Sequence, residues 1–175
     1  MSDNDVKAIV DYLRQVPAVS HKVEKSEYRM PLPPAWAPPV GVVDDVPKDD
    51  PLVYGAYLAG PLGHCIECHT PMEMGRSDYE NRAFAGGLHL PLGPDMIVTT
   101  ANITQDKNIT QDKETGIGAW SDAEIITGLT AGVRPDGSQI HPIMPYGFYA
   151  NMDNADIAAL VAFLRTVKPV VNAVK

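Results

Sequence analysis

The sequence predicts a mainly α-helical fold, in which a domain with long loops follows an extended, proline-rich segment. Two observations predict it. Apolar residues recur at helical spacing in three stretches, whereas only residues 96–99 have the character of a strand. Seven of the sixteen prolines lie within residues 31–51, where they favour an extended backbone.

The composition is that of a globular protein. Apolar residues make up 45% of the 175 residues and charged residues 21%, which suffices for a hydrophobic core. No stretch approaches the roughly 18 uninterrupted apolar residues of a membrane span. The net charge of −8 would repel a phosphate backbone, so we expect no nucleic-acid partner. Two cysteines are too few for a disulfide framework.

The first predicted helix covers residues 1–19. Its apolar positions form a helical stripe that consists of Val6, Ile9, Val10, Leu13 and Val16. Residues 21–50 follow as a stiff, proline-rich linker, which we expect to pack across a surface through Trp36. The alternative interpretation of this linker is a ligand for an SH3-type domain.

The compact domain is expected to span residues 51–172. Its first helix runs from Pro51, an N1 proline after Asp50, to about residue 59, where Gly60-Pro61 should end it. A second helix begins at Ser121, where Glu124 completes a capping box, and stops near Gly132. The buried stripe of this second helix is predicted at Ile125, Ile126, Leu129 and Val133.

The last helix starts at a cap provided by Asp153 or Asn154 and ends at Lys168-Pro169. Its apolar residues recur at helical spacing and are Ile157, Leu160, Val161, Leu164 and Val167. Between the helices, residues 102–107 are repeated as residues 108–113. Surface loops tolerate such a duplication, so we expect it to lie in one.

The first and last predicted helices are copies of one another. Residues 1–19 align without a gap on residues 152–170, with eight of nineteen positions identical and the apolar stripes coincident. A continuous apolar stripe has to be buried, and for the last helix the partner is the domain before it. We therefore expect residues 1–20 to be the terminal helix of another domain upstream, in a truncated chain. The alternative is a helix that docks on residues 51–172 or on a neighbouring molecule.

Both cysteines lie in one motif, Cys65-Ile66-Glu67-Cys68-His69, which reads C-x-x-C-H. This spacing is typical of the attachment of a c-type haem, because two thiols add to the two vinyl groups on one edge of the porphyrin and the histidine binds the iron. A zinc site would need further ligand pairs, and the chain has no other cysteine. The sequence therefore predicts one covalently bound haem c.

The second axial ligand has several candidates. A haem iron that carries electrons is commonly held by His and Met, and the Met raises its reduction potential. Met144 is the best placed, because it follows the motif in a loop that Pro145 stiffens, just before the last helix. Met96 and Met152 remain candidates, and His141 would give a bis-histidine haem of lower potential. A Met144 that only fills the core is a further alternative.

A set of further motifs accompanies the haem motif. It comprises Tyr54-Gly55-Ala56-Tyr57-Leu58, residues 101–104, residues 115–122, residues 132–137, Met144-Pro145-Tyr146 and the final Leu-Arg helix. This set resembles that of bacterial multihaem cytochrome c subunits of membrane-associated dehydrogenases, such as those for alcohol, gluconate and nicotinate. Full-length members carry two or three haem motifs, whereas this chain has one, and its duplicated loop is a second departure.

The resemblance implies a cytochrome c-type domain with His69 and Met144 as axial ligands of the iron. It further implies that Trp120 and Arg134 line the haem pocket or meet the propionates. The alternatives are that Trp120 only packs in the core and that Arg134 is only a solvated surface residue. Apolar packing around the ring would raise the potential, and its candidates are Ile103, Tyr146 and Leu160.

The function that the resemblance implies is electron transfer and not catalysis. The electron donor would be a dehydrogenase catalytic subunit, and the electron acceptor would be quinone, an oxidase or another cytochrome.

Residues 1–20 lack the features of an export signal. Haem is nevertheless attached to c-type proteins outside the cytoplasm, so we expect a periplasmic location and a truncated start. Two other classes stay open, namely a peroxidase-type haem enzyme with a labile distal ligand and a haem-based sensor or interaction module.

Overall fold

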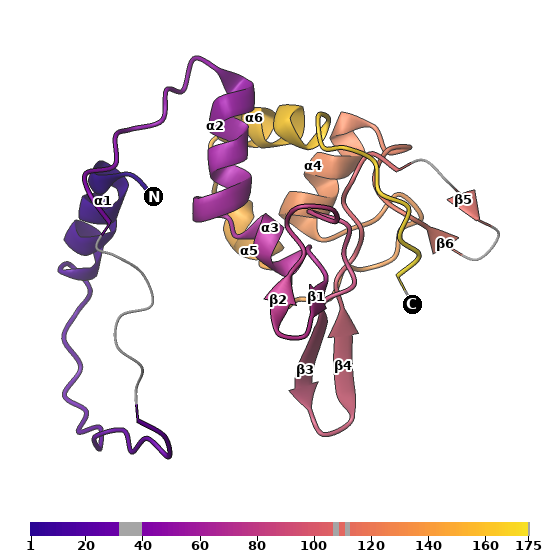
Figure 1. Ribbon diagram of the computed structural model, residues 1–175. Coiled ribbons are helices and arrows are strands. Elements are labelled where there is room, and N and C mark those ends of the chain that lie inside the picture. Colours follow the sequence, from indigo (N-terminus) through magenta and orange to yellow (C-terminus); the bar gives the residue numbers. More distant parts are fainter. Residues whose placement is uncertain (32–39, 107–108, 111–112, 175) are drawn as a thin grey trace. The chain divides into compact units, whose positions relative to one another are not determined.

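The structure, a computed structural model, describes residues 1–31, 40–106, 109–110 and 113–174. The chain divides into two units, residues 1–46 and residues 47–175 (Figure 1). Trp36 lies outside the described residues, so its packing role stays a prediction. Within the described part of the chain, no helix combines the length and the hydropathy that crossing a bilayer requires.

The described residues of the smaller unit form one helix and irregular chain. The helix α1 (Asp3–Leu13) begins at Ser2, whose hydroxyl accepts a hydrogen bond from the amide of Asp5 at 3.2 Å. The chain later returns to this end of the helix, where the Asp3 amide donates to the carbonyl of Val43 at 3.0 Å. The described residues between 17 and 47 form no helix or strand, in agreement with their proline content.

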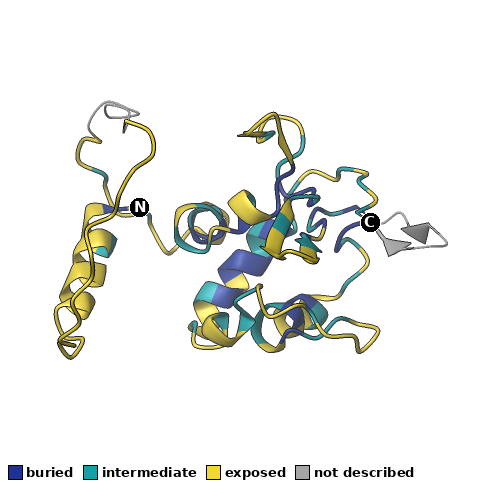
Figure 2. Cartoon of the chain, turned by 90° about the horizontal axis from the view of Figure 1, so that it is seen from below, coloured by how far each residue is buried: buried dark blue, intermediate teal, exposed yellow. Residues whose placement is uncertain are grey.

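Within the described residues of the smaller unit, nothing buries the apolar stripe of α1. Every residue of this helix is described and none is buried (Figure 2). The five stripe residues are between 38 and 60% exposed, and they are Val6, Ile9, Val10, Leu13 and Val16. In α6 (Asn154–Leu164), the residues that correspond to the first four are between 2 and 7% exposed, and they are Ile157, Leu160, Val161 and Leu164. Val167, the counterpart of Val16, lies beyond the end of α6 and is half-buried. Two copies of one amphipathic sequence therefore differ in whether the stripe is covered.

The larger unit is organised by the contact between α2 (Pro51–Tyr57) and α6 (Figure 1). Asp50 caps α2, because its carboxylate accepts hydrogen bonds from the amides of Leu52 and Val53. Gly55 faces α6, and a β-carbon at this position would lie 2.1 Å from the carbonyl oxygen of Ala159. The missing side chain therefore lets the two helices approach closely. The core includes buried residues of both helices and two residues directly after α2, and these are Tyr54, Leu58, Ala59, Ile157, Ala159, Leu160, Val161 and Leu164.

Two helix ends differ from the prediction. Gly60-Pro61 does not end the first helix, since α2 continues into a π-helical turn, η1 (Leu58–Leu62). In this wide turn, the Gly63 amide donates to the Leu58 carbonyl at 2.7 Å. The turn therefore needs no hydrogen bond from Pro61, which has no amide hydrogen. The last helix ends at Leu164 and not at residue 167, and its last carbonyl accepts from Gln105 Nε2 at 2.8 Å and from the Val167 amide at 3.2 Å.

The helix α4 (Asp122–Ala131) confirms most of its prediction. Ser121 and Glu124 form the capping box, and Gly132 ends the helix in a left-handed conformation with a φ of 68°. The predicted burial of Ile126 is wrong, because this residue is 36% exposed. The covered stripe runs through Ile125 and Gly128, which leaves Ile126 at its side.

The expectation of a single strand was also wrong. The predicted strand is present as β4 (Met96–Thr99), and it pairs antiparallel with β3 (His89–Gly93). Two further hairpins are present, β1 (Met72–Glu73) with β2 (Arg76–Ser77) and β5 (Ile109–Thr110) with β6 (Lys113–Glu114). These strands have two to five residues, too few to leave an alternating apolar pattern in the sequence. The second copy of the duplicated segment contributes to the β5–β6 hairpin.

The contact between α2 and α6 makes a prediction about stability. Gly55→Ala should lower the free energy of unfolding by about 1–3 kcal/mol, since the new methyl group has to push the helices apart. Chemical denaturation followed by circular dichroism measures the change. Gly60→Ala is the matched control, because a β-carbon there meets no atom within 4 Å. Equal stability of the two variants would contradict the role assigned to Gly55.

Candidate haem site

The haem motif lies on a single helical turn of the larger unit. The helix α3 (Cys65–Cys68) begins after His64, which adopts a left-handed conformation with a φ of 55°. Residues three positions apart share a face of a helix, so both thiols face the same side. Both are free thiols, of which Cys65 is buried and Cys68 exposed. Desolvation raises the pKa of both free thiols, that of Cys65 to about 11.

The imidazole of His69 is buried, and its hydrogen-bond partner assigns its tautomer. Nδ1 lies 2.7 Å from the carbonyl oxygen of Ala101. A carbonyl can only accept, so Nδ1 carries the hydrogen and Nε2 keeps a free lone pair. Burial lowers the pKa of this imidazole, while the hydrogen bond to Ala101 opposes the shift. The ring is therefore held neutral, which is the form that binds a metal ion.

This donor set fits a covalently attached haem. Two thiols on one face of a helical turn are followed directly by a neutral imidazole whose Nε2 is available. A structural zinc ion would need four ligands. Among the described residues, no group of three or more His, Cys, Asp or Glu side chains could hold a metal ion, so the zinc alternative gains no support there.

Met144 lies in a tight loop directly before α5 (Tyr146–Tyr149) and is half-buried. Its amide donates to the His141 carbonyl at 3.0 Å, and its carbonyl accepts from the Tyr146 amide at 2.8 Å. The backbone of this loop is therefore fixed on both sides of Met144, as the stiffness of Pro145 predicts.

Tyr149 connects the Met144 loop to the haem motif. Its hydroxyl donates to the carbonyl of Gly63 at 2.7 Å, two residues before Cys65. Burial, and then the nearby Cys65 and Cys68, raise the pKa of Tyr149 to about 12, so the hydroxyl keeps its hydrogen for this bond. The α5 segment is thereby tied to the start of α3, which lies next to it in Figure 1.

Two of the other candidates for the distal ligand, Met96 and His141, lie elsewhere or are engaged. Met96 is 52% exposed and begins β4 at the outer turn of the β3–β4 hairpin, which projects away from α3 and α5 (Figure 1). His141 is exposed, and its Nδ1 accepts a hydrogen bond from the Ile143 amide at 3.1 Å. Met152 is half-buried in the turn between α5 and α6.

The predicted pocket residues Trp120 and Tyr146 both lie against α4 and its end. Both are half-buried. A β-carbon built on Gly128 would lie 3.2 Å from the Trp120 ring, and one built on Gly132 would lie 2.6 Å from the Tyr146 ring. The two glycines therefore leave room for the two aromatic rings.

Arg134 and Ile103 occupy different surroundings. The Arg134 guanidinium donates to the Ser138 hydroxyl at 3.2 Å and the Gln139 carbonyl at 2.7 Å, within its own turn after α4. Ile103 is half-buried, two residues after Ala101, and its amide donates to the Phe84 carbonyl at 2.9 Å. The structure thus gathers Trp120, Tyr146 and Arg134 around α4, while Ile103 lies on the segment that binds His69.

Sequence reasoning missed the role of Ala101 and missed Tyr149. Ala101 acts through its carbonyl, which every residue has, and it is 32 positions away from His69. Residues 101–104 were noted as a motif, but no side chain in them indicates a bond to His69. Tyr149 follows Met144 closely, and a tyrosine next to a proposed ligand loop was the available signal.

The comparisons with known proteins agree with the motif. A sequence profile of the family described as Cytochrome c matches residues 55–168. The chain is 38% identical over 117 residues, 66% of its length, to the cytochrome c subunit of an alcohol dehydrogenase (quinone) from Gluconacetobacter polyoxogenes. It is 36% identical over 135 residues, 77% of its length, to the gluconate 2-dehydrogenase cytochrome c subunit of Pantoea cypripedii. It is 35% identical over 108 residues, 62% of its length, to a subunit of the nicotinate dehydrogenase of Pseudomonas putida.

These matches cover 22, 27 and 8% of the three relatives, so the chain spans less than a third of each. They confirm the resemblance to dehydrogenase cytochrome c subunits that the motifs predicted. Because the matched region contains the whole haem motif and most of the larger unit, the chain belongs to the cytochrome c family, whose members transfer electrons through covalently bound haem c.

Proposed function

We propose that this chain is an electron-transfer domain in which one haem c is attached at Cys65 and Cys68, with His69 and Met144 as the axial ligands of its iron. The observation that carries the proposal is the state of His69, which is buried and neutral, directly follows the two thiols and keeps Nε2 available. When bound, the haem supplies one-electron redox chemistry, and the chain holds and orients it.

The residues of the chain would set the properties of the site in separate ways. The carbonyl of Ala101 orients the His69 ring and raises its basicity. A thioether from Met144 would fill the opposite position, raise the potential and leave no open position for oxygen or a substrate. The link from Tyr149 to Gly63 supports Met144, since it ties the loop of this residue to the haem motif.

We assign the chain to a relay between a dehydrogenase catalytic subunit and quinone, an oxidase or another cytochrome, in the periplasm. The names of the relatives, cytochrome c subunits of an alcohol and a gluconate dehydrogenase, support the donor. The net charge of −8 suits a brief, electrostatically steered encounter with a more basic partner.

We also propose that α1 is the terminal helix of another cytochrome c domain, joined by the proline-rich linker of residues 21–50 to the domain of residues 51–172. It would pack against an α2-like helix as α6 does. The support is the residue-by-residue match of the two stripes, of which only the α6 stripe is covered.

The attachment can be tested on the thiols. The double substitution Cys65→Ser and Cys68→Ser should abolish covalent binding, because the chain has no other cysteine. Haem should remain on the unmodified chain in a denaturing gel, at one haem per chain by intact mass, and be lost from the variant. A variant that keeps its haem, or a count other than one, would contradict the proposal.

The distal ligand can be tested on Met144. Met144→Ala should lower the reduction potential by at least about 60 mV, which corresponds to a tenfold change in a one-electron equilibrium, and should let the ferrous protein bind carbon monoxide. Met96→Ala is the matched control and should change neither property. An unaltered potential in Met144→Ala would show that the ligand is another residue. Rapid binding of carbon monoxide by the unmodified protein would favour a haem enzyme instead.

The role of α1 can be tested by hydrogen exchange. In the isolated chain of 175 residues, the amides of α1 should exchange much faster than those of α6. In the protein as its host exports it, α1 should be protected, by about tenfold for each 1.4 kcal/mol of added stability. Fast exchange of α1 in both samples would overturn this part of the proposal.

A further inference from the structure

Two backbone segments hold His69, and they come from different parts of the chain. The carbonyl of His69 accepts a hydrogen bond from the Gly86 amide at 2.7 Å. Its ring nitrogen Nδ1 donates to the Ala101 carbonyl at 2.7 Å. Residues 84–88 therefore fix the backbone of His69, and residues 100–103 fix its ring.

These two segments are locked to each other. The Gly87 amide donates to the Thr100 carbonyl at 2.8 Å, and the Ile103 amide donates to the Phe84 carbonyl at 2.9 Å. Gly86, with a φ of 70°, has no room for a side chain, because a β-carbon would lie 2.5 Å from the Ala101 oxygen. A displacement of either segment therefore moves the carbonyl that binds the His69 ring.

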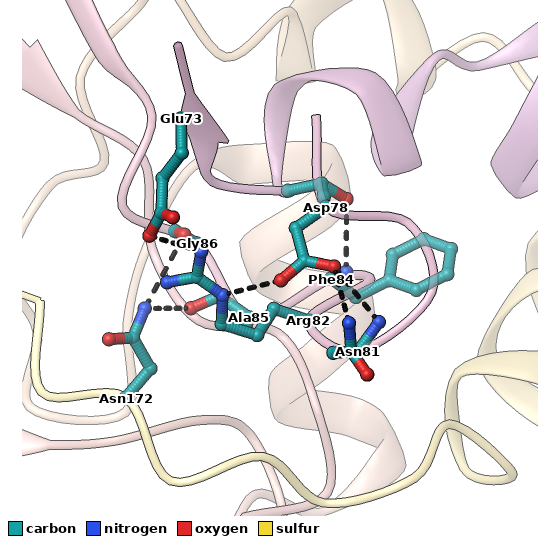
Figure 3. A network of polar contacts seen from close by, with 9 residues as sticks. Glu73, Asp78, Asn81, Arg82, Phe84, Ala85, Gly86 and Asn172 are labelled. Atoms are coloured by element: carbon teal, nitrogen blue, oxygen red, sulfur yellow. Dashed lines mark hydrogen bonds and ion pairs between the residues drawn. The ribbon is translucent and has the colours of Figure 1, made fainter. Parts of the chain in front are cut away.

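The chain after α6 binds both segments. The amide of the Asn172 side chain donates to the Ala85 carbonyl at 2.8 Å and to the Gly86 carbonyl at 3.4 Å (Figure 3). Asn102 donates to the Val170 carbonyl at 2.8 Å, and the Val170 amide donates to the Thr104 hydroxyl at 3.1 Å. We call residues 168–174 the C-terminal tail.

The bonds that the C-terminal tail makes through Val170 lie where water cannot replace them easily. Asn102 is 5% exposed and Thr104 is fully buried, so losing the bond to Val170 would leave the side-chain amide of Asn102 buried and unpaired. Ala101, by contrast, is exposed, and packing around its own side chain does not fix its carbonyl. The position of that carbonyl therefore depends on its neighbours and, through them, on the tail.

We propose that Asn172 is a positioning residue for the proximal haem ligand: by clamping residues 85 and 86, it sets the strength of the hydrogen bond between His69 Nδ1 and the Ala101 carbonyl, and thereby the reduction potential. The proposal rests on the proposed role of His69 as an iron ligand. A hydrogen bond to the second nitrogen makes the imidazole a more basic ligand, which favours the ferric state. Loosening the clamp weakens that bond and favours the ferrous state.

The test replaces Asn172 by leucine, which has a similar shape and no donor. In the haem-loaded Asn172→Leu chain, we expect the Nδ1 hydrogen of His69 to exchange at least about tenfold faster in the ferrous protein, by nuclear magnetic resonance. At a fixed ambient potential, the ratio of ferrous to ferric protein should rise about three- to tenfold. This effect is smaller than that of replacing the direct hydrogen-bond partner of a metal ligand, because Asn172 acts through residues 85 and 86. Val171→Ala, in the same tail at a residue that is 70% exposed, should change neither value.

Two comparisons keep the outcomes separate. Gly55→Ala destabilises the fold through α2 and α6 without touching the tail. Equal shifts of the ferrous-to-ferric ratio in Gly55→Ala and Asn172→Leu would therefore mean that Asn172 has a merely structural role, and would overturn the inference.

Should Asn172→Leu not fold, Thr104→Val removes the hydroxyl that binds Val170 and should give the same two shifts. If unmodified protein lacks the spectrum of a histidine-bound haem, the proposed function fails. If that spectrum is present and neither Asn172→Leu nor Thr104→Val moves it or the ratio, only the role of Asn172 fails.

Discussion

An imidazole has one hydrogen to give and one lone pair to offer, and the 2.7 Å bond from Nδ1 of His69 to the Ala101 carbonyl decides which nitrogen does which. The other features of the site depend on this assignment. The haem motif itself can place two thiols and a histidine side by side, because they lie on one helical turn. It cannot orient the ring, since the acceptor lies 32 residues further along the chain. The local motif becomes a site only when the loops around it have folded.

The helices make that long-range contact possible. The close approach at Gly55 joins α2, which leads into the haem motif, to α6, which leads into the C-terminal tail. At the end of α6, Arg165 donates to the Trp120 carbonyl at 2.6 Å and pairs with Asp122 at the start of α4. The end of α6 is thereby tied to α4, and the tail departs toward residues 84–86 from a fixed point. The helical framework and the proximal side of the site are thus one connected structure.

The sequence was sufficient for the features that depend on neighbouring residues. Capping boxes, helical stripes and the haem motif are local patterns, so α4 and α6 were found at nearly their observed positions, and the haem motif was found without the helical turn α3 that carries it. The π-helical turn at Pro61 was missed because proline usually ends a helix, and here the preceding contact with α6 holds the turn in place. The hairpins and the carbonyl of Ala101 were missed for another reason. They are fixed by backbone hydrogen bonds between distant segments, which any side chain permits.

Attachment and orientation are therefore separate properties of this fold. Under the proposals above, the thiols of Cys65 and Cys68 would hold the haem whatever the tail does, whereas the tail would act on His69. The internal repeat follows the same division. The first copy repeats the apolar stripe of α6 in α1, and it has Arg14 at the position of Arg165 and Val19 at the position of Val170. At the position of Asn172, however, it has His21. The residues that build the framework are repeated and the proposed positioning residue is not. This pattern is expected if the framework serves any domain of this kind, while the residue after it adjusts the ligand of an individual haem.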